Sequence, residues 1–115
     1  MSTTISAVVA PLVERKVFVT EEEAVRSLLR EYILRQIETL QQEMALFEQK
    51  YGMRFEQFAA YVHERSVLLE KGELSPERRR LLGQAIMQEE DDWMDWKVAR
   101  EMLESWLGLR QETMG

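Results

Sequence analysis

Apolar residues recur at helical spacing over a long segment in the first half of the chain. From Ile33 to Tyr51 they follow one another at intervals of 4, 3, 4, 3 and 4 residues, a heptad-like pattern that predicts an amphipathic helix with a narrow apolar seam. Thr20 and Glu23 have the spacing of a capping box at the start of this helix, and Gly52 favours a left-handed cap at its end. We therefore predict a helix of about 30 residues, roughly 45 Å long at 1.5 Å per residue.

The predicted seam is long for so small a protein. A chain of 115 residues buries a modest fraction of its surface, and its remaining segments are too short to cover such a helix along its whole length. We therefore expect much of the seam to pack against a second copy of the chain or against another protein. The residues that we assign to dimerisation are Ile33, Ile37, Leu40, Met44 and Phe47.

Helical patterns also occur on both sides of the long helix. Residues 5–13 indicate a short helix followed by a turn, and residues 54–69 place apolar side chains on one face of a second helix. Ser75-Pro76 supplies an N-cap and a first helical residue for a third helix, which we expect to pause near Glu90. A last helical segment follows, and we expect its end to fray after Gly108.

These elements predict an all-α fold in which a long central helix is joined by two or three further helices. We assign residues 1–52 to an N-terminal arm and a long dimerisation or scaffold helix, and residues 53–115 to a helical partner-binding region. The chain has no cysteine, which excludes disulfides and thiolate zinc sites. No apolar run reaches the ~18–20 residues of a membrane helix, so we expect a cytoplasmic protein without membrane contact.

Negative charge is concentrated near the C-terminal end. The formal net charge is −6, and residues 89–115 contribute −5 of it, with three basic and eight acidic residues. Within residues 89–96, five acidic residues surround two tryptophans, a combination typical of binding hot spots. We assign partner binding to Asp91, Asp92, Trp93, Asp95, Trp96, Leu103 and Trp106. The alternative is that Trp93 and Trp96 fold back onto the second helix as core residues.

Candidate chemistry is sparse in this sequence. His63 is the only histidine, and its neighbour Glu64 does not share its helix face. No Gly-rich phosphate loop, nucleophile elbow or Glu-x-x-His metal motif occurs. Residues 78–80 are three consecutive arginines, best interpreted as a solvated helix face. We therefore expect a binding protein that is not an enzyme and needs neither a metal nor another cofactor.

Two stretches resemble small prokaryotic type II antitoxins. Residues 11–32, with the run Thr20-Glu21-Glu22-Glu23-Ala24-Val25-Arg26, resemble the entry to the second helix in the N-terminal part of ribbon-helix-helix antitoxins and repressors. Residues 47–58 and 91–96 are similar to antitoxins that are encoded beside compact, TumE-like ribonuclease toxins. The resemblance covers about residues 11–107, and it implies a protein that neutralises a toxin by masking its basic active surface and that represses its own operon. The chain departs from the family in lacking an N-terminal strand with alternating basic side chains.

Two other functions compete with an antitoxin. The resemblance around residues 20–32 also fits a DNA-binding transcriptional regulator, although a pI near 4.9 disfavours unaided binding to phosphates. A structural adaptor that self-assembles through the long seam is the third interpretation. The expected partners are thus a cognate toxin and a second copy of the chain or a hetero-oligomer, with DNA only weakly indicated.

Overall fold

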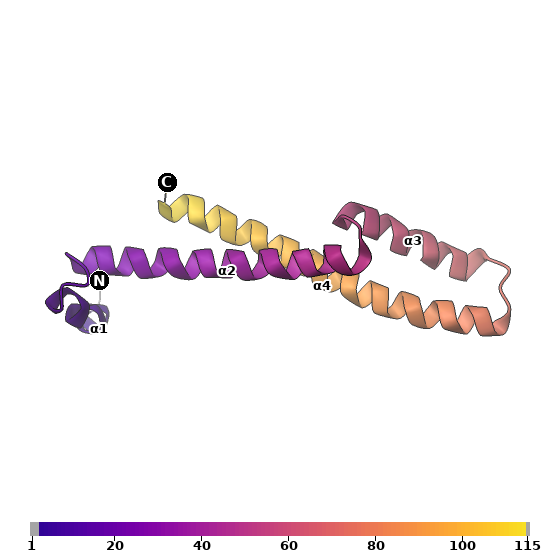
Figure 1. Ribbon diagram of the computed structural model, residues 1–115, viewed down its shortest axis with the longest axis horizontal. Coiled ribbons are helices and arrows are strands. Elements are labelled where there is room, and N and C mark those ends of the chain that lie inside the picture. Colours follow the sequence, from indigo (N-terminus) through magenta and orange to yellow (C-terminus); the bar gives the residue numbers. More distant parts are fainter. Residues whose placement is uncertain (1–2, 115) are drawn as a thin grey trace. The chain divides into compact units, whose positions relative to one another are not determined.

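The computed structural model describes residues 3–114, and within them it contains four α-helices and no strand. In chain order these are α1 (Thr3–Glu14), α2 (Glu21–Tyr51), α3 (Phe55–Lys71) and α4 (Pro76–Met114), as Figure 1 shows. The predicted all-α fold class with a long central helix is therefore confirmed. Since residues 15–20 form turns and bends, this part of the chain has no ribbon strand. No helix within residues 3–114 combines the length and apolar character needed to cross a membrane.

Local hydrogen bonds set the ends of α2 where the sequence predicts them. The Thr20 hydroxyl accepts a hydrogen bond from the backbone N–H of Glu23 at 3.1 Å, which satisfies one of the free donors of the first turn. At the other end Gly52 has a φ of +63°, and its N–H donates to the carbonyl of Glu48 at 2.7 Å. The resulting helix has 31 residues, as the hydrophobic spacing predicts.

The later helix starts are also local. The backbone N–H of Arg54 donates to the side chain of Gln57 at 3.0 Å at the start of α3. The Ser75 hydroxyl accepts from the backbone N–H of Arg78 at 3.3 Å, with Pro76 as the first residue of α4. Arg79 donates to the carbonyl of Leu69 at 2.6 Å, so one residue of the arginine run ties the start of α4 to the end of α3.

The C-terminal half of the chain differs from the prediction in one respect. α4 is a single helix of 39 residues that extends past Gly108 to Met114, so the expected pause near Glu90 is wrong, while fraying of the helix end stays a prediction. The helix continues because its buried face runs through the acidic segment. Ile86, Glu89 and Trp96 are all buried, and their spacings keep them on one side of a helix. The acidic residues therefore interrupt neither the helix nor its packed face.

Contacts divide the chain into two units. Unit 1 comprises the described parts of Met1–Glu38 and Ser105–Gly115, and unit 2 comprises Thr39–Glu104. In unit 1, Val9 of α1 and Ala24 of α2 are buried, and the Ser6 hydroxyl donates to the carboxylate of Glu21 at 2.8 Å. The predicted division into residues 1–52 and 53–115 separates functional regions and not contact units, and it stays a prediction.

The core of unit 2 lies where α2, α3 and α4 meet. Its buried members are Phe58, Val62 and Trp96. Partly buried apolar residues surround them, and these are Met44, Phe47, Tyr51, Met53, Phe55, Tyr61 and Trp93. Seven of these ten residues are aromatic, so packed rings make up most of this cluster.

The seam of α2 is already covered within the chain. Ile33 is 0% exposed, Ile37 3% and Leu40 6%, while Met44 and Phe47 pack against the core of unit 2. The inference that the seam needs a second chain to cover it is therefore wrong. Its premise failed because α4 is one continuous helix that lies beside α2 within each unit. Trp96 stacks on Phe47 in unit 2, and Trp106 contacts Tyr32 in unit 1. Dimerisation itself stays a prediction.

Candidate protein-binding surface

Trp96 lies at the centre of the aromatic core of unit 2. Its ring is stacked on Phe47 of α2, with the centroids 5.5 Å apart. It also contacts two rings of α3, Phe55 at 5.5 Å and Phe58 at 5.6 Å. With 0% of its surface exposed, Trp96 is a core residue. This corrects the assignment of Trp96 to partner binding and confirms for Trp96 the alternative of packing against the second helix.

Trp93 lies at the edge of the same core. It is half-buried, its ring is stacked on Phe55 at 6.4 Å, and the ammonium of Lys97 lies 5.3 Å from its centroid. Its Nε1 is buried and has no hydrogen-bond partner among the described residues. Trp93 thus offers only part of its surface to a partner.

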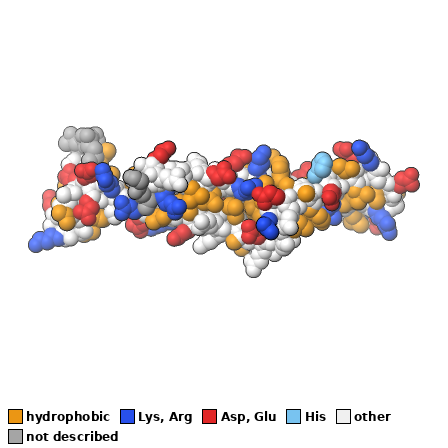
Figure 2. All heavy atoms as spheres, turned by 90° about the horizontal axis from the view of Figure 1, so that it is seen from above, with side chains coloured by type: hydrophobic (Ala, Val, Ile, Leu, Met, Phe, Trp, Pro, Cys, Tyr) orange, Lys and Arg blue, Asp and Glu red, His pale blue; other side chains and the backbone are white. Residues whose placement is uncertain are grey.

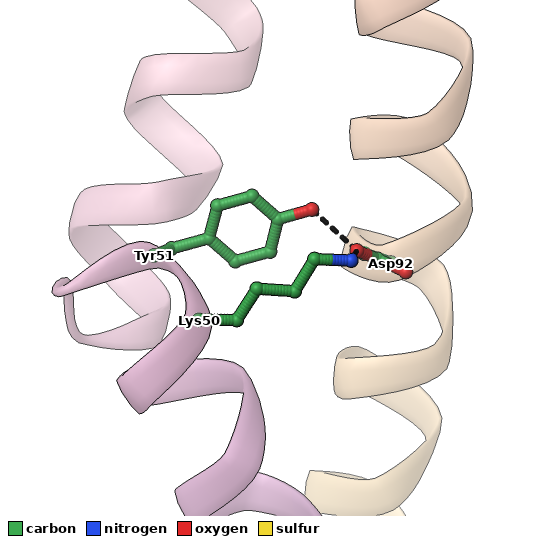
Figure 3. A network of polar contacts seen from close by, with 3 residues as sticks. All are labelled: Lys50, Tyr51 and Asp92. Atoms are coloured by element: carbon green, nitrogen blue, oxygen red, sulfur yellow. Dashed lines mark hydrogen bonds and ion pairs between the residues drawn. The ribbon is translucent and has the colours of Figure 1, made fainter.

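Asp92 anchors the end of α2 to α4, as Figure 3 shows. The same carboxylate oxygen, Oδ2, accepts two hydrogen bonds. One comes from the Lys50 ammonium at 2.7 Å, and the other comes from the Tyr51 hydroxyl. Burial by itself raises the pKa of Asp92, but these two hydrogen bonds outweigh it and lower the pKa below its usual value. Burial, together with the hydrogen bond to Asp92, raises the pKa of the Tyr51 hydroxyl. Asp92 is therefore committed to the fold.

Two further acidic residues of the segment are used by contacts with α3. Glu89 is only 8% exposed and forms an ion pair with Arg65 at 2.9 Å. Glu90 accepts a hydrogen bond from the Ser66 hydroxyl at 3.3 Å. Together with Asp92, these contacts show that three of the five acidic residues hold helices together. The acidic run is thus in large part structural.

Asp91 and Asp95 differ from the other acidic residues of the segment. Both are exposed, and neither takes part in an ion pair or a side-chain hydrogen bond found among residues 3–114. They are four residues apart on α4, so they lie on one face of the helix. Of the predicted partner-binding residues, these two carboxylates are the ones that the fold leaves unused.

The last two predicted binding residues fall in different units. Leu103 is half-buried in unit 2, whereas Trp106 belongs to unit 1. The ring of Trp106 contacts Tyr32 of α2 edge-on at 5.9 Å, and it is half-buried. The structure therefore places Asp91 to Leu103 in unit 2 and Trp106 in unit 1.

A groove lies between α2 and α4 in unit 2, with a volume of about 540 Å³. We call it the α2–α4 groove. From α2 it is lined by Glu43, Leu46, Phe47 and Lys50. From α4 it is lined by Asp95, Val98, Ala99 and Met102. Both sets have the spacing i, i+3, i+4, i+7 of a single helix face, so two parallel rows of side chains form the walls.

The groove has an apolar middle and charged ends. Leu46 is 64% exposed, and Val98 and Met102 are each about half-exposed, so these side chains present apolar surface to solvent. Figure 2 shows, on the face that it displays, apolar side chains reaching the surface between charged ones of both signs. Exposed apolar side chains that gather in a groove are more informative than scattered ones, since such clusters mark interaction sites.

Other candidate groups are less organised. A second and smaller pocket in unit 2, of about 310 Å³, is lined by residues that include His63, Glu90 and Trp93. His63 is exposed on α3, and among the described residues no three His, Cys, Asp or Glu side chains are placed to hold a metal ion. Arg78 and Arg80 are exposed, while Arg79 binds backbone carbonyls. The surface with the clearest organisation in unit 2 is therefore the α2–α4 groove with Asp91 and Asp95 beside it.

Comparison with protein-family models, with curated proteins and with solved structures found no match to this chain. The antitoxin resemblance therefore stays a prediction that rests on the residues quoted above.

Sequence reasoning missed most of the groove. It identified Asp95 and Phe47, but it overlooked Leu46, Val98 and Met102. A signal for the α4 side was present, because Asp95, Val98 and Met102 follow one another at spacings of three and four residues. α4 has two apolar faces, and packing against α3 decides which of them is buried and which is left open. The sequence pattern does not reveal this choice.

Proposed function

We propose that this protein binds a basic protein partner through the face of α4 that carries Asp91 and Asp95, and that it acts as an antitoxin. The partner in this proposal is a ribonuclease-type toxin whose basic active surface becomes masked. The resemblance to type II antitoxins supports the identity of the partner, and the charge distribution supports the mode of binding. The operon repression that the resemblance implies, and the homodimer expected from the sequence, belong to the same proposal.

One observation carries the proposal. Of the five acidic residues between positions 89 and 96, three make contacts that stabilise unit 2, and Asp91 and Asp95 remain exposed without a partner. Unpaired carboxylates four residues apart attract a surface that is rich in Lys and Arg and accelerate its association. A ribonuclease active surface is basic because it binds phosphates. An acidic helix face that binds this surface therefore covers the same Lys and Arg side chains that bind RNA.

The test uses the full chain and the protein encoded by the adjacent reading frame. We expect the two to co-purify, and we expect the chain to suppress RNA cleavage by that protein. The double variant Asp91→Asn/Asp95→Asn should weaken the complex about 10-fold, or ~1.4 kcal/mol, and should flatten the dependence of the association rate on salt.

Glu101→Gln/Glu104→Gln is the matched control. Both residues are exposed acids of α4, so the double variant removes the same charge from the same helix outside the acidic segment. We expect it to change affinity less than about 2-fold. Absence of binding between the two proteins, or equal effects of the two double variants, contradicts the proposal.

A further inference from the structure

We propose that the α2–α4 groove receives an amphipathic helix of the partner, with apolar residues along one face and Lys or Arg at both ends of that face. This inference deepens the proposed function and rests on it for the identity of the partner. It adds a docking site, a secondary structure for the docking segment and a charge pattern. The steps that lead to it use residues of unit 2 alone.

The walls of the groove decide the secondary structure of its occupant. Both walls are α-helices, whose backbone N–H and C=O groups in mid-helix are already hydrogen-bonded. An extended segment finds no free backbone groups there and leaves its own unpaired. A helix satisfies its own backbone groups and buries only side chains, which is the helix-in-groove mode of recognition.

The length of the contact follows from the spacing of the lining residues. On each wall the first and last of them, Glu43 and Lys50 on α2 and Asp95 and Met102 on α4, are seven residues apart, or roughly 10 Å at 1.5 Å per residue. An occupant running along the groove therefore meets it over about two helical turns, using apolar side chains at positions i, i+3, i+4 and i+7. Leu46 and Val98, one on each wall, are the exposed apolar side chains nearest the middle.

Unpaired acids near each end of the groove decide the charge of the occupant. α2 and α4 are antiparallel here, since Phe47 contacts Trp96 and Tyr51 contacts Asp92. Glu43 and Asp95 therefore lie toward opposite ends, and neither has an ion pair among the described residues.

The other charges do not cancel these two. The one basic lining residue, Lys50, is held by Asp92 at 2.7 Å. Asp91 extends the acidic end by one turn along α4. A helix with an apolar middle and a basic residue at each end is complementary to this arrangement.

The same charges argue against a second copy of this chain as the occupant. A symmetric pairing through the groove places Glu43 and Asp95 of one copy near the same acids of the other. Like charges brought together at an interface oppose association.

The first experiment measures binding of a synthetic probe to the full chain. The probe is a fluorescein-labelled, side-chain-stapled helical peptide of about 16 residues, with Leu at i, i+3, i+4 and i+7 and with Lys at both ends of that face. The control peptide replaces every Lys by Glu. We expect the basic peptide to bind at least about 10-fold more tightly than the acidic one at low salt. Equal binding of both peptides overturns the charge assignment.

Methionine methyl signals locate the bound probe. Met102 lines the groove, and Met87 is 69% exposed on the same helix but outside it. In a sample with isotope-labelled Met methyl groups, we expect the Met102 signal to shift on addition of the basic peptide and the Met87 signal to stay. The reverse pattern, or binding without a change at Met102, places the peptide elsewhere and refutes the groove.

Matched variants then connect the groove to the partner. Leu46→Glu/Val98→Glu places charge in the apolar middle, and both side chains are exposed enough for the fold to persist, which circular dichroism checks. Met87→Glu is the control for an added acid. We expect the double variant to lose at least about 10-fold in affinity for both the peptide and the adjacent-frame protein, and Met87→Glu to lose less than about 2-fold.

The outcomes separate this inference from the proposed function. If Asp91→Asn/Asp95→Asn weakens binding of the adjacent-frame protein while Leu46→Glu/Val98→Glu does not, the groove inference fails and the proposed function stands. If the basic peptide binds at Met102 but the adjacent-frame protein does not bind the chain, the groove stands and the proposed antitoxin function fails. A concentration-dependent dimer in light scattering that Leu46→Glu abolishes assigns the groove to a second copy and overturns the inference.

Discussion

Replacing Trp96 tests whether the centre of the acidic-aromatic segment belongs to the core or to a binding surface. The side chain is 0% exposed and contacts rings from both α2 and α3. Truncation of such a residue to alanine removes its burial and leaves a cavity, which costs about 3–5 kcal/mol. Small domains are stable by only ~5–15 kcal/mol, so we expect Trp96→Ala to be severely destabilised or partly unfolded at 25 °C.

A milder substitution keeps this measurement quantitative. The Nε1 of Trp96 is buried without a hydrogen-bond partner among residues 3–114, so Trp96→Phe removes an unsatisfied polar group together with part of the packing. Loss of packing and relief of the unpaired N–H oppose each other. We therefore expect Trp96→Phe to cost only about 1–2 kcal/mol, clearly less than the alanine variant.

Urea denaturation followed by circular dichroism supplies the free energies of unfolding. Met94→Ala is the control, because Met94 lies two residues away on α4 and is 50% exposed; its expected cost is below about 0.5 kcal/mol. The expected order of cost is Trp96→Ala, then Trp96→Phe, then Met94→Ala. A Trp96→Ala protein within about 1 kcal/mol of the unsubstituted chain refutes the core assignment, since no fully enclosed tryptophan is removed so cheaply.

Three further predictions concern contacts within or next to unit 2. The lowered pKa of Asp92 means that its ionised form stabilises the fold at pH values above the ordinary pKa near ~3.9. This stability is lost as the pH falls through the lower folded-state pKa. Tyr51→Phe should reduce the loss in acid titrations of unfolding, and an unchanged acid profile contradicts the prediction. Gly52→Ala meets no atom within 4 Å but must adopt a φ of +63°, so calorimetry should show a loss of about 1 kcal/mol; no loss means that the turn relaxes freely. Arg65→Met leaves the carboxylate of Glu89 buried without its cation, which should cost about 2–4 kcal/mol in urea denaturation, whereas the double replacement of both residues by Met should recover most of this.

Helix boundaries were predictable because short-range contacts set them. Thr20 bonds the backbone three residues ahead, Gly52 adopts a positive φ, and Ser75 bonds the backbone N–H of Arg78. Each of these interactions involves residues within one helical turn, so their spacing in the sequence is also their spacing in space. The all-α class and the bounds of α2 follow from such signals together with the period of the apolar residues.

The roles of the acidic-aromatic segment were decided only by the tertiary structure. The spacing of Trp93 and Trp96 places them on one helix face, but whether that face meets α3 or solvent depends on residues more than thirty positions away, such as Phe55 and Phe58. Likewise, Asp92 is fixed by Tyr51, which lies on another helix.

A local pattern states which side chains share a face, because backbone geometry is periodic. It does not state what that face packs against. The sequence alone therefore determined the all-α class, the bounds of the long helix and an excess of acid. Long-range packing determined that α4 is one continuous helix, that Trp96 is enclosed and that Asp91 and Asp95 are left free.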